Sequence, residues 1–116
     1  MDFVGNDGTN IHKNLGEQLN IVGGYTGSGT TSSKNIKTLD QNGDLEIQMA
    51  DDAVFNSLTT GNTVMNTNGV SIGTGDTAVS LTNAGLNNGG NKITNVANGT
   101  ADNDAVNVGQ MQTAVA

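Results

Sequence analysis

Few side chains in this sequence are of the types that perform catalysis. The 116 residues include one histidine, His12, and neither cysteine nor arginine. A general acid–base or nucleophilic site needs several reactive groups within hydrogen-bonding reach of each other. The acidic pairs Asp51–Asp52 and Asp102/Asp104 stand where helices are predicted to begin, and capping of those helices explains them. We therefore predict that the protein is not an enzyme, that His12 is an exposed strand residue, and that no cofactor is bound.

Two stretches carry part of a calcium-site pattern. Asp40, Asn42 and Asp44 alternate as in an EF-hand loop, but Leu45 stands where that loop needs glycine. The segment 73–76 resembles a turn of a calcium-binding β-roll, a fold that requires tandem nonapeptide repeats. No such repeats occur, so we expect no metal site and interpret residues 40–44 as a hairpin turn.

The apolar content is low for a globular monomer. Hydrophobic residues make up 34% of the chain and aromatic residues 3%. Ordering a domain of this size costs on the order of 100–200 kcal/mol of conformational entropy, which large apolar side chains normally offset. A chain with so few of them is either partly disordered or buries surface against other copies of itself. The alternating apolar pattern described below favours the second interpretation.

The formal net charge of −7 repels phosphate backbones and anionic lipid surfaces. We therefore expect no nucleic-acid partner. The sequence has no signal peptide and no apolar run of transmembrane length, and we expect it to be a segment of a longer protein.

Short alternating stretches separated by Gly, Asn, Thr, Ser and Asp predict a β-meander. The clearest element is a hairpin of Asn35–Leu39 and Asp44–Met49, because Asn42-Gly43 between them supplies the positive φ of a primed turn. Asn68-Gly69 predicts a second hairpin. We also predict a short helical turn at residues 51–58, a turn-rich segment at residues 83–90, and further strands at residues 9–14, 17–22, 63–65, 69–72 and 77–82.

The last fifteen residues, 102–116, contain no turn dipeptide and predict a helix. Val108, Met111 and Val115 are spaced three and then four residues apart, which is one a–d–a step of a coiled coil. Thr100 or Asp102 is the predicted N-cap. A surface helix with a narrow apolar stripe remains an alternative, because one heptad does not distinguish the two.

Three blocks near the C-terminus share the order and spacing of a known motif. The blocks consist of Lys92, Ile93, Thr94, Asn95 and Val96, then Gly99 and Thr100, then Asp104, Ala105, Val106, Asn107 and Val108, continuing through Met111. They resemble the neck of the trimeric autotransporter (YadA-like) adhesins. Upstream, three stretches are similar to the GIN head module of the same family: 14–24, the pairs Asn35-Ile36 and Asp44-Leu45, and 55–58 with 68–70.

The resemblance implies a mainly β homotrimer. It implies a β-prism head of short antiparallel strands over residues 1–88, a β neck over residues 89–103, and the start of a parallel three-stranded coiled coil over residues 104–116. Val108, Met111 and Val115 would then face the trimer axis, with Ile93 and Val96 packed beneath the head.

The function implied by the resemblance is that of a segment of a bacterial surface adhesin fibre, on the outer side of the outer membrane. Such a segment would contribute to attachment to host cells or matrix and to cell aggregation. Host cell-surface or extracellular-matrix proteins are the candidate partners, and the membrane would be reached only through a C-terminal anchor outside this segment. We assign no ligand-contact residues. A trimeric phage tail-fibre or spike segment and a calcium-binding β-roll module are the alternatives, and the neck motif favours the adhesin.

Overall fold

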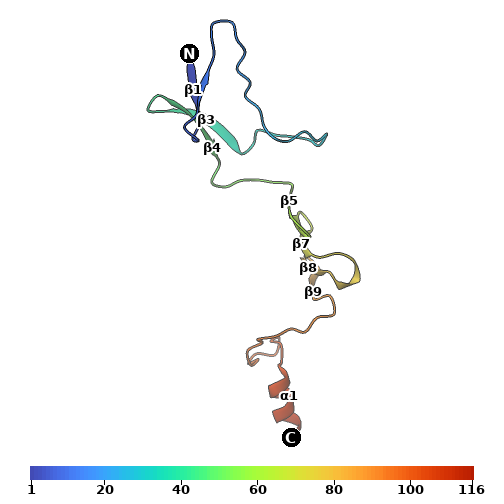
Figure 1. Ribbon diagram of the computed structural model, residues 1–116. Helices are drawn as coiled ribbons and strands as arrows, with labels where there is room; N and C mark the ends of the chain where they lie inside the picture. The colour runs from blue at the N-terminus through green and yellow to red at the C-terminus, as the bar shows by residue number, and fades with distance from the viewer. The chain divides into compact units, whose positions relative to one another are not determined.

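A computed structural model describes all 116 residues and divides them into two compact units, Met1–Ser32 and Ser33–Ala116. The elements are nine strands, one short 3-10 helix and one α-helix (Figure 1). No helix has the length and apolar character that would let it cross a membrane.

The first unit is built around one hairpin. Strands β1 (Asp2–Val4) and β2 (Asn10–His12) pair antiparallel, with Phe3 opposite Ile11. His12 therefore lies on an exposed strand, as predicted. A tight turn follows, in which the Glu17 N–H donates to the carbonyl of Asn14 at 3.0 Å.

The strand predicted at residues 17–22 is absent, so this prediction was wrong. Its alternation of apolar and polar residues is genuine, but Ile21 is 83% exposed and the segment pairs with no other strand of the chain. A strand needs a partner for its backbone N–H and C=O groups, and this segment finds none within one chain.

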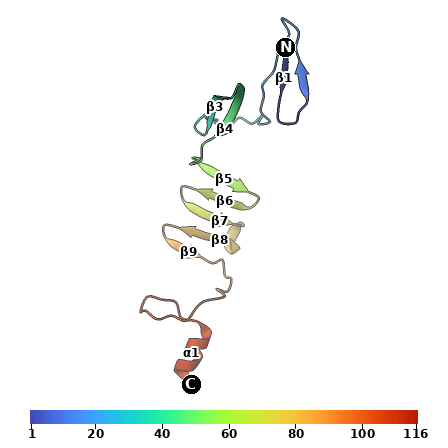
Figure 2. The ribbon, with the colours of Figure 1, turned by 90° about the vertical axis from the view of Figure 1, so that its left-hand side faces the viewer.

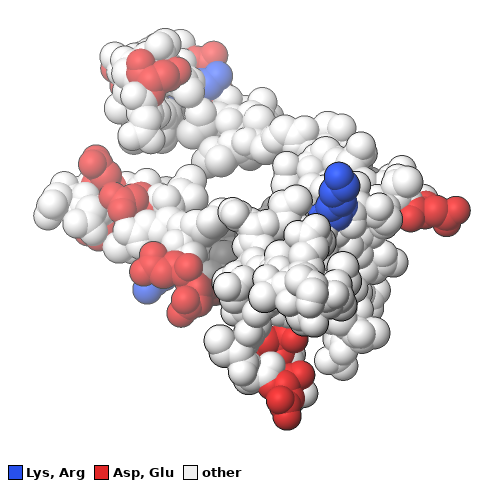
Figure 3. Space-filling view, turned by 90° about the horizontal axis from the view of Figure 1, so that it is seen from below, with Lys and Arg blue, Asp and Glu red and all other residues white.

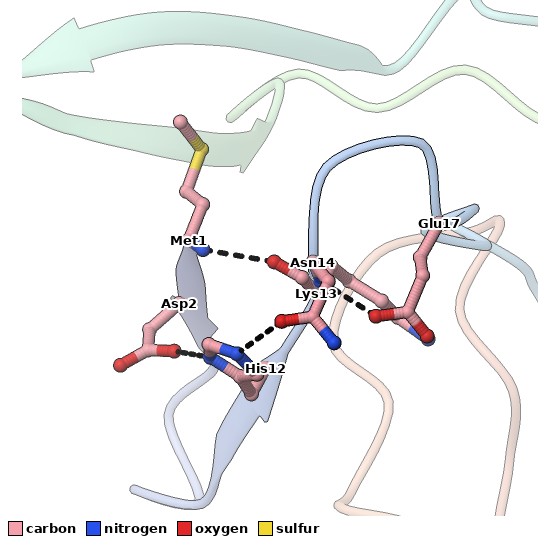
Figure 4. A network of polar contacts seen from close by, with 6 residues as sticks. All are labelled: Met1, Asp2, His12, Lys13, Asn14 and Glu17. Atoms are coloured by element: carbon pink, nitrogen blue, oxygen red, sulfur yellow. Dashed lines mark hydrogen bonds and ion pairs between the residues drawn. The ribbon is translucent and has the colours of Figure 1, made fainter.

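His12 links the hairpin to the turn (Figure 4). Its Nδ1 lies 2.6 Å from Asp2 Oδ1 and its Nε2 lies 3.0 Å from Asn14 Oδ1. The Asp2 carboxylate, followed by the Asn14 side chain, raises the pKa of His12 above its usual value. The Asn14 N–H in turn donates to Glu17 Oε1 at 2.6 Å.

The second unit begins with the predicted hairpin, which is confirmed. Strands β3 (Ile36–Gln41) and β4 (Asp44–Met49) pair in register around Asn42 and Gly43, whose φ angles are 53° and 90°. Positive φ at both positions is the mark of a type I′ turn. The Gly43 N–H donates to Asp40 Oδ1 at 2.8 Å, which adds a side-chain bond to the turn.

Residues 51–58 do not form the predicted helical turn. The side chain of Asn35 bonds both backbone groups of Val54, with its Nδ2 donating to the carbonyl and its Oδ1 accepting from the N–H, each at 2.9 Å. These are the contacts that a neighbouring strand would make, and they hold the segment extended. The chain then enters a strand at Ser57.

Five strands form one antiparallel meander in sequence order (Figure 2). They are β5 (Ser57–Thr60), β6 (Thr63–Asn66), β7 (Gly69–Ile72), β8 (Val79–Thr82) and β9 (Gly85–Asn87), with the 3-10 helix η1 (Gly75–Thr77) before β8. The predicted meander is confirmed, although β5 and β9 were not predicted.

The second predicted hairpin forms with a shifted turn. Gly69 opens β7 opposite Asn66, so the two-residue loop is Thr67–Asn68. Gly69 also lies opposite Thr82 of β8 and has a φ of 132°. A Cβ atom at this position would overlap the carbonyl oxygen of Leu81, so glycine is required here by close approach of backbone to backbone.

The meander has one apolar and one polar face. One row of directly opposed residues crosses all five strands and is entirely apolar: Leu58, Met65, Val70, Leu81 and Leu86. The adjacent row, which points to the opposite face, is mostly polar: Thr59, Val64, Ser71, Ser80 and Asn87. We call the first set the apolar row. Four of its five members are more than half exposed, and no side chain anywhere in the chain is fully buried.

Candidate functional site

The segment that carries the neck-like motif runs from Asn88 to the C-terminal helix. It begins in a turn fixed by two asparagines. Asn88 Nδ2 donates to the carbonyls of Asn91 and Lys92 at 2.9 and 3.2 Å, and Asn91 Nδ2 donates back to the carbonyl of Asn88 at 2.9 Å. No strand is paired within residues 88–107 of the single chain. The β neck predicted over residues 89–103 therefore forms no strand within one chain.

Asp104 closes a small loop. Its Oδ2 accepts from the backbone N–H groups of Thr100 and Ala101 at 3.0 and 2.9 Å, and from the Thr100 hydroxyl at 3.4 Å. The backbone bonds from Ala101 and Thr100 lower the pKa of the Asp104 carboxyl, because they stabilise its charged form. The carboxylate thus organises the loop before the helix and does not cap the helix itself.

Helix α1 (Val108–Val115) begins later than expected, and its N-cap is Asn107. The predicted caps, Thr100 and Asp102, were wrong. Asn107 Oδ1 accepts from the Gln110 N–H at 2.9 Å, and Gln110 Oε1 accepts from the Asn107 N–H at 3.3 Å. This reciprocal pair is a capping box. An N-cap residue followed three positions later by Gln is a local pattern that sequence reasoning could have used.

The same two side chains also bind the chain upstream of the helix. Gln110 Oε1 accepts from the Gly99 N–H and Gln110 Nε2 donates to the Gly99 carbonyl, both at 2.9 Å. Asn107 Nδ2 donates to the Val96 carbonyl at 3.0 Å and to Asn98 Oδ1 at 2.8 Å. We call these five residues the neck clasp. It joins the first turn of α1 to the segment 96–99.

Gly99 is held too closely for a side chain. A Cβ atom there would lie 2.6 Å from the carbonyl oxygen of Ala105, which is shorter than a carbon–oxygen contact allows. The motif predicted Gly99 and Asn107 as neck residues without giving them a role, and it gave no role to Gln110. The contacts of Gly99 with Gln110 and of Asn107 with Val96 each join residues eleven positions apart. A local sequence pattern does not predict contacts over that separation.

Apolar side chains of the neck surround an open hollow. The hollow, about 600 Å³ in volume, is lined by Ile93, Val96, Val106 and Val108 among others. Ile93, Val106 and Val108 are each about two-thirds exposed. Lys92 and Thr94 flank Ile93 in the sequence and are exposed, and Asn95 has a φ of 65°.

The three predicted axis residues lie on the helix. Met111 and Val115 follow Val108 at the spacing that places side chains on one side of a helix, and they are 53% and 76% exposed. The structure therefore presents an apolar stripe on α1 that continues from the hollow, with nothing covering either in one chain.

Comparison with known proteins identifies the family of this chain. A family model described as the coiled stalk of trimeric autotransporter adhesin matches residues 92–116. The trimeric autotransporter adhesin AtaA of Acinetobacter sp. strain Tol 5 is 29% identical over 125 residues, which cover 88% of this chain and 3% of that protein. The crystal structure of N-terminal domain 1 of VompD from Bartonella quintana matches with a TM-score of 0.64 and 32% identity, over 99% of this chain and 97% of that one.

The chain belongs to the trimeric autotransporter adhesins. A solved structure of the AtaA C-terminal stalk fused to GCN4 adaptors is 31% identical over 76% of this chain and 30% of that chain, with a TM-score of 0.36. The chain spans about 3% of the length of AtaA, the curated relative that it matches. The predicted mainly β fold with short antiparallel strands and one C-terminal helix is confirmed.

Membership in the trimeric autotransporter adhesins also bears on whether the relatives of this chain are enzymes. Its relatives are adhesins and not enzymes. The match favours the adhesin over both alternatives considered from the sequence, the phage fibre and the calcium-binding β-roll. Members of this family act at the bacterial cell surface.

Proposed function

We propose that this chain is one protomer of a homotrimeric segment of a surface fibre. The observation that carries the proposal is the apolar row, which crosses five paired strands and is uncovered in a single chain. Exposed apolar surface of this regularity marks an interface in a soluble protein. Three copies would each turn this face inward and build the core that one copy lacks.

The helix supports the same arrangement. Val108, Met111 and Val115 would meet their counterparts on the axis of a parallel three-stranded coiled coil. Ile93 and Val96 would pack under the head, with the hollow beside them filled by a neighbouring chain. In this proposal residues 1–88 form the β-prism head, residues 89–103 the neck, and residues 104–116 the start of the stalk.

The biological role we propose is adhesion. The segment would stand on the outer side of the bacterial outer membrane, anchored through a part of the protein beyond it, and contribute to attachment to host cells or matrix and to cell aggregation. Family membership supports this role. Most side chains are uncharged, and the acidic side chains (red) outnumber the lysines (blue) (Figure 3).

Two measurements test the proposal separately. Multi-angle light scattering of the chain at micromolar concentration tests assembly: we expect the mass of a trimer, and a well-folded monomer would contradict it. Binding of the trimer to host cells and to immobilised matrix proteins, beside a neighbouring stalk segment of equal length, tests adhesion. Equal binding by both segments would contradict an adhesive role for this one.

A further inference from the structure

The sequence contains four Asn-Gly pairs, at 42–43, 68–69, 88–89 and 98–99. Such a pair can react with itself. The glycine nitrogen attacks the carboxamide carbon of the asparagine, and the absence of a glycine side chain leaves that approach open. The reaction needs the asparagine side chain and the glycine N–H to be free and the local backbone to open. The structure differs at the four pairs in these requirements.

The neck clasp holds both reacting groups of the pair at 98–99. Asn98 Oδ1 accepts from Asn107, and the Gly99 N–H is bonded to Gln110 at 2.9 Å. The Gly99 carbonyl is bonded to the same Gln110 side chain. This pair cannot rearrange unless the helix cap and the loop come apart together.

In the two other pairs the glycine is partly buried. The Asn88 side chain is also held by hydrogen bonds, whereas the Asn68 side chain makes none. Asn88 Nδ2 donates to two carbonyls, and Gly89 is partly buried against the backbone of Thr77. Gly69 is partly buried in β7, between paired residues of β6 and β8.

The pair at 42–43 is the exception. Both of its residues are exposed, whereas the glycine of each other pair is partly buried. The Asn42 side chain makes no hydrogen bond within the chain, and the Gly43 N–H is held by one side chain, the exposed carboxylate of Asp40. The hairpin has only two strands. An isolated two-stranded hairpin is marginal in water and opens readily.

We propose that Asn42 is the site of spontaneous deamidation in this protein. When the turn opens, solvent base removes the Gly43 N–H proton and the nitrogen bonds to Asn42 Cγ. The bond from Cγ to the amide nitrogen breaks and ammonia leaves, giving a cyclic imide. Water then adds to either imide carbonyl and yields aspartate or isoaspartate. The net change is gain of one water and loss of one ammonia, with no oxidant or cofactor.

The modification has a physical consequence at the hairpin tip. It adds a negative charge between Asp40 and Asp44, which already flank the turn. Isoaspartate also inserts a methylene into the backbone of a two-residue turn, whose geometry depends on positive φ at both positions. The modified hairpin therefore loses its tight turn.

Incubation of the full chain in mildly alkaline buffer, followed by digestion in acid and peptide mass spectrometry, tests the proposal. Oxygen-18 water during incubation separates this reaction from any that occurs during digestion. We expect label to enter the peptide containing Asn42 first, as a mixture of aspartate and isoaspartate. Reaction at Asn68, Asn88 or Asn98 as fast as at Asn42 would overturn the proposal.

Two variants sharpen the result. Asn42→Gln should lose the early phase, because a glutamine side chain forms the imide far more slowly; an unchanged early phase would also overturn the proposal. Gln110→Ala frees the Gly99 N–H and should increase label at Asn98 while leaving the rate at Asn42 unchanged. No increase at Asn98 would show that its contacts are not what protects it.

Discussion

The side-chain amide of Gln110 bonds both the N–H and the carbonyl of Gly99, each at 2.9 Å. One side chain in the first turn of the helix thereby fixes a backbone position eleven residues earlier. Gln110 also closes the capping box with Asn107. The segment before the helix is therefore held by hydrogen bonds within each chain, and it does not rely on apolar contact alone.

Removing this side chain should loosen the neck. Gln110→Ala deletes the partner of both Gly99 groups in a partly buried place, and we expect a loss of about 1–3 kcal/mol per chain in unfolding free energy. Chemical unfolding followed by circular dichroism measures it. Gln112→Ala is the matched control, because the Gln112 side chain is exposed and makes no hydrogen bond. Equal losses in the two variants would argue against the clasp.

Gly99→Ala tests the close approach to Ala105. The added methyl would lie 2.6 Å from a carbonyl oxygen, and we expect a loss of about 1–3 kcal/mol from the strain. Gly109→Ala is a control inside the helix, where the nearest atom to a new Cβ lies 3.5 Å away. That variant should be neutral or gain up to about 1 kcal/mol from helix propensity. Thermal unfolding of the two variants side by side decides between these outcomes.

Asp104 should make the neck sensitive to acid. Its folded-state pKa is lowered below the usual 3.8 by backbone hydrogen bonds. Its contribution to stability is therefore present above pH 3.8 and is lost as the pH falls through the lowered pKa. Asp104→Asn should flatten the dependence of unfolding on pH in that acidic range. An unchanged dependence in Asp104→Asn would mean that the bonds from Thr100 and Ala101 to this carboxylate do not stabilise the neck.

His12 should titrate above its usual value because of Asp2. Since its folded-state pKa is raised from 6.5, the stabilisation of the first hairpin is present below pH 6.5 and is lost as the pH rises through the raised pKa. Titration of the imidazole by NMR measures this directly. Asp2→Asn should lower the pKa of His12, and an unchanged value would mean that the contact in Figure 4 does not persist in solution.

Local patterns predicted the parts of this fold that local chemistry determines. Asn42-Gly43 placed the β3–β4 hairpin because both residues accept positive φ, and alternation located most of the meander. The errors arose where a distant residue decides the outcome. Asn35 holds Val54 extended across nineteen positions, so no helical turn forms there.

In the candidate site, too, the sequence predicted what local residues determine and missed what distant contacts determine. The motif identified Gly99, Asn107 and Val108 by their types and spacing. It did not reveal that Gln110 joins the loop to the helix, because that contact exists only after the chain folds back. The strand expected at residues 17–22 does not form, because no other strand of the chain pairs with it. The alternation of apolar and polar residues does not show whether such a partner exists.

The helix stripe gives a direct test of the predicted axis. Val108→Asp or Met111→Asp would place three like charges together in an apolar environment, where they repel and lack solvation. We expect either change to lower the melting temperature of the trimer strongly. Thr113→Asp, on an exposed residue outside the stripe, is the control. An unchanged melting temperature for Val108→Asp and Met111→Asp would mean that the axis lies elsewhere.

The central claim is that three chains meet on the apolar row, and neighbouring residues of β8 test it most directly. Leu81 belongs to the apolar row and Ser80 points to the opposite face. We predict that light scattering gives the mass of a trimer for the unchanged chain and for Ser80→Asp, and a lower mass for Leu81→Asp. A trimer that survives Leu81→Asp but dissociates with Ser80→Asp would contradict the account.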